Sequence, residues 1–133
     1  MRKEELKYIE QKTGFKTAGG SDNGPAWIGW VKLTKSGRGF YFDGKLFRRI
    51  RMLFYSNYRA SDGNDYWVSG VKKQGDNRYP WGNQKVKIQA SAVSEFLKLR
   101  GEEKLDKSKF EVAEMEDAFE VEWADEREER ENL

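Results

Sequence analysis

The chain has 133 residues, of which 37% are hydrophobic and 36% are charged, and its formal net charge is +2. It contains no histidine and no cysteine, which excludes disulfides, zinc sites built on thiolates or imidazoles, and hydrolases that need a histidine base or a cysteine nucleophile. No apolar run approaches the roughly 20 residues of a membrane-spanning helix. The first residues also lack the apolar stretch of a secretory signal. We therefore expect one domain-sized, cytoplasmic chain that does not associate with membranes.

The charge is distributed unevenly along the chain. Residues 1–100 hold 20 basic and 9 acidic side chains, a net +11, whereas residues 101–133 hold 5 and 14, a net −9. This contrast predicts a basic body and an acidic tail. The predicted organisation is an N-terminal helix and loop over 1–25, a basic, aromatic-rich β domain with a closing helix over 26–101, and an acidic, helical tail over 102–133.

The N-terminal segment fits two structures. Leu6 and Ile9 recur at helical spacing, and Thr13-Gly14 offers a C-terminal stop, which together favour a short helix. The alternative is a short strand through Tyr8. Residues 14–25 concentrate Gly, Ser, Asp, Asn and Pro and are predicted to form a loop.

The middle of the chain has the pattern of a small β structure. Thirteen of the 19 aromatic residues lie between Trp27 and Trp81, and four or five short strands are expected between Ala26 and Ile88. Asp43-Gly44 separates two apolar runs and predicts a hairpin with a type I′ turn. Further turns are expected at 61–64 and 74–77. The predicted fold class is α+β, with a small antiparallel, barrel-like sheet.

Two helices are predicted after the strands. Residues 91–100 carry apolar side chains at helical offsets, and Gly101 stands where a helix would end. In the tail, Ser108 and Glu111 match a capping box, and Val112, Met115, Phe119 and Trp123 form one stripe of a helix from about 109 to 130. The alternative for the last part is a strand, because Phe119, Val121 and Trp123 alternate.

Cationic and aromatic side chains are mixed in the basic body. Such mixtures bind single-stranded nucleic acid, because bases stack on aromatic rings while cations contact phosphates. The alternative is that the aromatic residues form the core of a barrel and the cations only solvate its surface. The candidate nucleic-acid-binding residues are Arg48, Arg49, Arg51, Tyr55, Tyr58, Arg59, Lys72, Lys73, Arg78, Tyr79 and Trp81.

The acidic tail predicts a second kind of interaction. Its stripe of Val112, Met115, Phe119 and Trp123 could dock into the groove of a protein partner, so that 109–123 would act as an adaptor or inhibitor. It could equally fold back on its own basic body, or remain a solvated appendage.

We predict no catalytic residues, no cofactor and no metal site. Carboxylate pairs could still perform acid–base chemistry, but the body has only nine acidic residues and its Asp residues all fall in predicted turns. The acidic turn at Asp62 lacks the glutamate that would close a calcium-binding loop, since position 73 is Lys73.

Several stretches resemble a group of small, uncharacterised bacterial proteins. The similar residues are 7–10, 22–29 and 66–73, together with Asp76, Arg78 and Trp81. Some members of this group carry the label of a deoxyxylulose-phosphate synthase, a thiamine-diphosphate enzyme several times longer than this chain. The resemblance implies a bacterial, cytoplasmic, self-contained domain over roughly 7–101, and it implies no active site.

Overall fold

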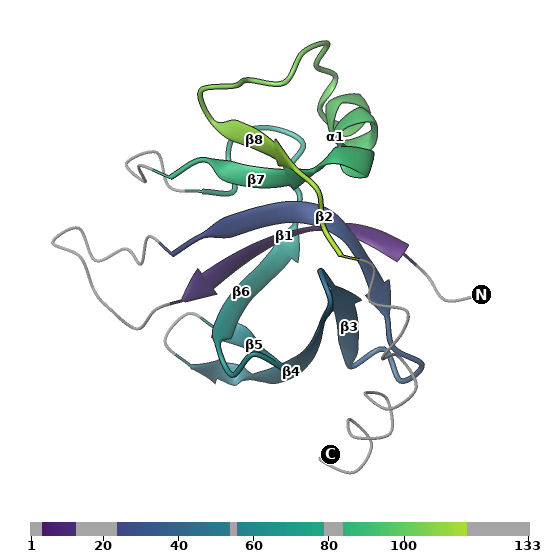
Figure 1. Ribbon diagram of the computed structural model, residues 1–133, viewed down its shortest axis with the longest axis vertical. Coiled ribbons are helices and arrows are strands. Elements are labelled where there is room, and N and C mark those ends of the chain that lie inside the picture. Colours follow the sequence, from purple (N-terminus) through teal and green to yellow (C-terminus); the bar gives the residue numbers. More distant parts are fainter. Residues whose placement is uncertain (1–3, 13–23, 54–55, 79–83, 117–133) are drawn as a thin grey trace, which may run out of the picture.

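The computed structural model describes residues 4–12, 24–53, 56–78 and 84–116 (Figure 1). A 3-10 turn over Ala90–Ala92 leads into the helix α1. The elements in chain order are β1 (Glu4–Lys12), β2 (Ala26–Leu33), β3 (Gly39–Phe42), β4 (Lys45–Leu53), β5 (Ser56–Ala60), β6 (Asp65–Gly70), β7 (Val86–Gln89), α1 (Val93–Arg100) and β8 (Phe110–Ala113).

Six antiparallel strands form a closed barrel. Their order is β1-β6-β5-β4-β3-β2, and pairing of β1 with β2 closes the ring. The predicted small barrel is confirmed, but six strands, β2 to β7, occupy the region where four or five were predicted. With β1 and β8, the described part of the chain has eight strands and is mostly β, with one short helix. No helix in these residues is long and apolar enough to cross a membrane.

The N-terminal helix is a wrong prediction, because residues 4–12 form strand β1. Leu6 and Ile9, which suggested helical spacing, point to different sides of this strand: Leu6 packs against a cluster outside the barrel, and Ile9 lies in the cluster inside it. Both faces of β1 are covered, so the strand lacks the simple alternation of a half-exposed one. The alternative strand through Tyr8 is the structure that forms.

An outer layer covers one side of the barrel. Strand β7 pairs in parallel with β2, and β8 pairs in parallel with β7. Figure 1 shows these two strands and α1 together at one end of the molecule. The helix predicted over 91–100 is confirmed by α1, and Gly101 ends it in the left-handed conformation with φ of 67°.

The start of the predicted tail helix is also wrong. Residues Phe110–Ala113 form β8 instead, and the Ser108 hydroxyl donates a hydrogen bond to Oδ1 of Asp106 at 2.5 Å. Pairing with β7 and contact of the Phe110 ring with Phe96, with centroids 5.1 Å apart, stabilise the strand. The remainder of the predicted helix, 117–130, lies outside the described residues.

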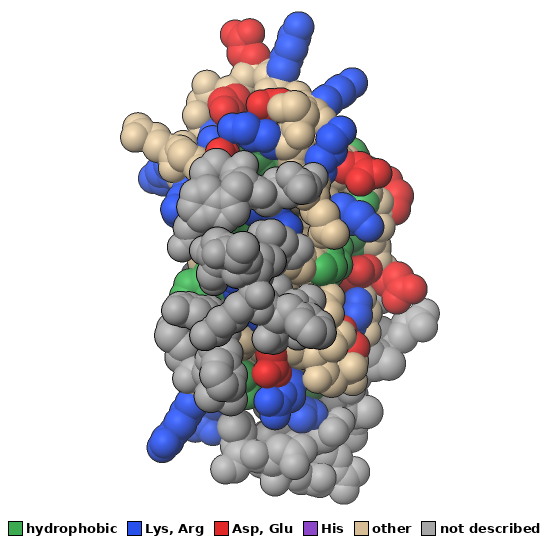
Figure 2. Space-filling view, turned by 90° about the vertical axis from the view of Figure 1, so that its left-hand side faces the viewer, with side chains coloured by type: hydrophobic (Ala, Val, Ile, Leu, Met, Phe, Trp, Pro, Cys, Tyr) green, Lys and Arg blue, Asp and Glu red, His purple; other side chains and the backbone are tan. Residues whose placement is uncertain are grey.

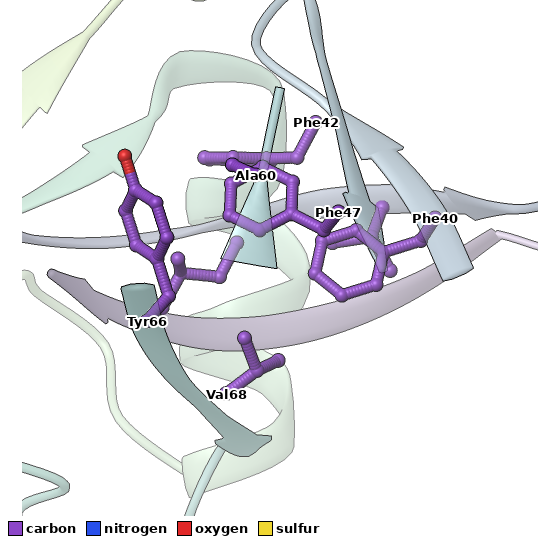
Figure 3. Close-up of a cluster of buried hydrophobic side chains, with 8 residues drawn as sticks. Phe40, Phe42, Phe47, Ala60, Tyr66 and Val68 are labelled. Atoms are coloured by element: carbon purple, nitrogen blue, oxygen red, sulfur yellow. The ribbon is translucent and has the colours of Figure 1, made fainter. Parts of the chain in front are cut away.

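The barrel interior is an aromatic core. Phe47 lies at its centre, with ring centroids 4.7 Å from Phe40 and 4.8 Å from Tyr66. Figure 3 shows these side chains converging from β3, β4 and β6. Ile9, Val31, Phe42, Ala60 and Val68 complete this inner cluster. The interior is therefore filled by side chains, as expected for a small barrel.

A second cluster joins the barrel wall to the outer layer. It consists of Tyr8, Ala26, Ile28, Val86, Ile88 and Phe96. Tyr8 and Ile28 come from the outer surface of the wall, while Ile88 and Phe96 come from β7 and α1. This outer cluster holds the two layers together.

Two of the predicted turns are confirmed. Asp43 and Gly44 have φ of 48° and 74°, as the hairpin between β3 and β4 requires. The turn at 61–64 connects β5 to β6. The third predicted turn, 74–77, lies instead in a bend that leads from β6 towards β7.

The turn at Asp62 makes stability depend on pH. Burial opposes ionisation of Asp62, but hydrogen bonds from the Tyr66 hydroxyl at 2.6 Å and the Asn64 amide at 2.8 Å outweigh it and lower the pKa below 3.8. A carboxyl group whose pKa is lower in the folded protein than in the unfolded chain stabilises the fold fully at pH values above the unfolded-state pKa. This stabilisation is lost as the pH falls through the folded-state pKa. We expect Asp62→Asn to destabilise the protein at pH 7, with the difference from wild type shrinking below pH 3.8 in thermal unfolding. A difference that stays constant with pH would contradict this.

Candidate functional site

Two of the predicted residues, Arg49 of β4 and Tyr58 of β5, meet at one rim of the barrel. Arg49 lies opposite Tyr58, its guanidinium carbon is 5.9 Å from the ring centroid, and its Nη2 is 3.4 Å from the phenol oxygen. The Tyr58 ring also lies 5.1 Å from Phe40, so the interior cluster supports it. The pair therefore joins the aromatic core to the exposed surface.

One cation of this rim was not predicted. The backbone N–H of Arg49 donates to the carbonyl of Arg38 at 3.1 Å, and both side chains are exposed. Arg51 follows two residues later and is exposed as well. We call Arg38, Arg49, Arg51 and Tyr58 the rim cluster. Arg38 precedes β3 in a loop, and only the pairing of β3 with β4 brings it beside Arg49.

The other predicted residues are not all part of this cluster. Arg48 is half-buried, and Arg59 is exposed but its Nε is 2.7 Å from Oδ1 of Asp65. Lys72 and Lys73 are exposed after β6. Tyr55, Tyr79 and Trp81 lie outside the described residues. On the face shown in Figure 2, Lys and Arg side chains are interspersed with Asp and Glu.

Arg78 differs from the other predicted cations because it is nearly buried. Its side chain is 9% exposed, and its Nη1 lies 3.6 Å from Oε1 of Glu10, which is 8% exposed. The Tyr8 hydroxyl donates to the same oxygen at 2.5 Å, and Lys12 binds the other. Burial and the bond to Glu10 raise the pKa of Tyr8, so its hydroxyl keeps its proton and remains a donor. These four residues, Tyr8, Glu10, Lys12 and Arg78, form the buried charge cluster.

The first part of the segment after β6, residues 71–77, is fixed beside this cluster by hydrogen bonds. The Asn77 amide bonds to the Ser69 hydroxyl, to the carbonyl of Gly70 and to the N–H of Lys72. From α1, Arg100 Nη1 donates to the carbonyls of Lys72 and Gly75 at 2.8 and 2.7 Å. These bonds fix the backbone that directly precedes Arg78.

A pocket of about 240 Å³ opens between the barrel wall and the outer layer. Its apolar lining comes mainly from the outer cluster, and its polar lining comes from the loop before β7, the end of α1 and the residues before β8. The lining residues are Tyr8, Ile28, Asp76, Asn77, Arg78, Gln84, Lys85, Val86, Phe96, Arg100, Ser108, Lys109 and Phe110. We call this the interlayer pocket.

Most of this pocket was missed in the sequence. Tyr8 and Glu10 were assigned to a helix, and Phe110 to the tail, so nothing suggested that they approach Arg78. The alternation of Tyr8, Glu10 and Lys12, which places all three on one face of a strand, is a local signal that could have grouped them. Arg100 and Lys109 carry no local signal for the pocket, because α1 is placed there by the packing of Phe96 in the outer cluster and β8 by its parallel pairing with β7.

The predicted partner-binding stripe is divided. Val112 is 52% exposed on β8, whereas Met115 packs against the interior cluster of the barrel. The next residue, Glu116, donates its N–H to Oδ1 of Asp43 at 2.8 Å, which ties this segment to the β3–β4 turn. Phe119 and Trp123 lie outside the described residues. At Met115, the tail therefore contacts its own body.

In the described part of the chain, the acidic side chains do not gather into a metal site. Within residues 4–12, 24–53, 56–78 and 84–116, no group of three or more Asp and Glu residues could hold a metal ion. At the turn that suggested calcium, both oxygens of Asp62 accept hydrogen bonds from the protein.

Comparisons of the chain with protein-family models, with curated proteins and with solved structures found no match. The rim cluster and the interlayer pocket are therefore the two features of the described residues whose chemistry indicates a function.

Proposed function

We propose that this protein is a non-enzymatic module that binds single-stranded nucleic acid through the rim cluster. The observation that carries the proposal is the Arg49–Tyr58 pair, in which a guanidinium lies over an aromatic ring at the rim of the barrel. Aromatic rings and guanidinium planes offer flat surfaces on which bases stack, for about 1 to 3 kcal/mol each. Arg38 and Arg51 supply exposed cations beside them.

The surrounding charge supports the same ligand. Residues 1–100 carry a net +11, which attracts a polyanion from a distance and accelerates its association. Arg59 contributes little to this positive charge, because Asp65 forms an ion pair with it. Contacts with phosphates and stacking on Tyr58 require little sequence readout, so we expect binding with weak base preference.

Fluorescence anisotropy with labelled single-stranded oligonucleotides tests this function. We expect binding that weakens steeply between roughly 50 and 200 mM salt, since each phosphate contact releases counterions. Arg49→Gln should reduce both the affinity and its salt dependence, whereas Tyr58→Phe should leave both nearly unchanged because it keeps the ring. Tyr58→Ala should weaken binding about tenfold, as expected for losing one stacked base.

The matched control is Lys98→Gln, which removes one positive charge from an exposed position on α1. It should change the affinity only slightly. If salt has no effect on binding, or if Lys98→Gln and Arg49→Gln weaken it equally, the rim cluster is not the nucleic-acid site.

A further inference from the structure

We propose that the interlayer pocket binds a small anionic molecule that contains a planar ring. This site is distinct from the rim cluster, shares no residue with it, and would take a single small molecule rather than a strand. The apolar side chains inside the pocket and the cationic side chains around its opening together determine which class of ligand it would bind.

The size and the lining of the pocket suit one ring. A cavity of about 150 Å³ accepts benzene, and sites for drug-sized molecules begin near 300 Å³, so about 240 Å³ leaves room for a ring with one substituent. Three aromatic side chains, Tyr8, Phe96 and Phe110, contribute to the lining. Aromatic rings favour offset or edge contacts with a planar guest.

The rim of the pocket favours an anion. Among the lining side chains that the structure describes, four are cationic, from Arg78, Lys85, Arg100 and Lys109, and one is anionic, from Asp76. Asp76 pairs with Lys109 at 3.0 Å, and Glu10 and Glu102 pair with Arg78 and Arg100 from outside the lining. The balance remains positive with these carboxylates included. An anionic substituent would therefore be attracted to the rim.

The cations are held in place before a ligand arrives. Glu10 forms an ion pair with the guanidinium of Arg78, and two backbone carbonyls accept hydrogen bonds from the guanidinium of Arg100. Prior ordering lowers the entropic cost of binding. Lys85, exposed just before β7, is the rim cation that a substitution can remove without disturbing a buried contact.

The experiment is a titration of the full chain followed by ¹⁵N NMR, with benzoate, phenyl phosphate and uridine 5′-monophosphate as the anionic probes. Benzyl alcohol is the neutral counterpart of benzoate, and uridine is the neutral counterpart of uridine 5′-monophosphate. Inorganic phosphate is an anion without a ring and is compared with phenyl phosphate. We expect the anionic rings to shift the amide signals of Val86, Phe96, Arg100 and Phe110. Each neutral counterpart should bind about tenfold more weakly, the loss expected for one charge-assisted hydrogen bond.

Two variants and one control test the assignment of residues. Lys85→Gln should weaken the binding of the anionic probes several-fold and leave the neutral ones unchanged, whereas Lys98→Gln should affect neither. Phe110→Ala should weaken all ring-containing probes, and its spectrum reports directly whether β8 still pairs with β7. If that pairing is lost, Lys85→Gln alone decides the outcome.

The comparison of probes also identifies the chemical class of the ligand. Tighter binding of uridine 5′-monophosphate than of benzoate would indicate a nucleotide, and the reverse would indicate an aromatic acid. Equal binding of benzyl alcohol and benzoate, binding of inorganic phosphate as tight as that of phenyl phosphate, or signal shifts confined to residues outside the lining would each overturn the proposal. Failure of the rim cluster to bind oligonucleotides would leave it unaffected.

Discussion

Replacing Glu10 with glutamine is expected to lower the free energy of unfolding by about 3 kcal/mol or more. The substitution keeps the shape of the side chain and removes only its charge. Glu10 and Arg78 are 8% and 9% exposed, and Lys12 is 14% exposed, so both cations would lose their counter-charge away from solvent. Breaking a buried ion pair by removing one partner costs about 3 to 5 kcal/mol, because the remaining charge stays desolvated.

Urea unfolding followed by tryptophan fluorescence measures this effect. Asp65→Asn is the matched control, since it breaks the ion pair with Arg59, whose side chain is 54% exposed. Solvent screens such a pair, and we expect a much smaller change. A Glu10→Gln effect no larger than that of Asp65→Asn would show that water reaches the buried charge cluster.

A double variant separates charge from packing. Adding Arg78→Met to Glu10→Gln removes the guanidinium that was left without its carboxylate and fills its volume with an apolar chain. We expect part of the lost stability to return, because apolar replacement of buried charges is often neutral or favourable. The double variant should also weaken anion binding in the interlayer pocket, since Arg78 is one of its rim cations.

The features that were predicted correctly are encoded by residues close together in the chain. The Asp43-Gly44 hairpin needs positive φ at two adjacent residues, and the end of α1 needs it at Gly101. Neither depends on distant parts of the protein. The barrel itself was expected because aromatic residues, glycines and turns recur at short intervals between Trp27 and Trp81.

The features that were missed depend on contacts between distant segments. Strand β1 pairs with β2 and β6 on its two edges, and both of its faces are covered, so its local pattern resembled a helix. Strand β8 forms where β7 offers it a parallel partner and where Phe110 contacts Phe96 of α1. The same pairings bring Tyr8, Arg78 and Phe110 around one pocket, which explains why sequence patterns indicated the basic rim but not the interlayer pocket.

Phe47→Ala is expected to cost about 3 to 5 kcal/mol, the usual effect of removing a buried aromatic side chain. Phe47 is 1% exposed, and its ring contacts Phe40, Tyr66 and Phe42 at centroid distances of 4.7, 4.8 and 6.2 Å. The four rings and Val31 come from four strands, β2, β3, β4 and β6. Loss of the Phe47 ring should therefore destabilise the whole barrel. Phe47→Leu should cost less, because it fills part of the cavity.

Phe96→Ala provides the informative comparison. Phe96 is also 1% exposed, but it lies in the outer cluster, where it joins α1 and Phe110 to the barrel wall. Native-state hydrogen exchange should therefore show faster exchange throughout β1 to β8 in Phe47→Ala, but mainly in α1, β7 and β8 in Phe96→Ala. Equal acceleration everywhere in both variants would mean that the two clusters unfold as one unit. In that case a ligand in the interlayer pocket would stabilise the rim cluster as well, because binding to the folded state would oppose the same unfolding equilibrium.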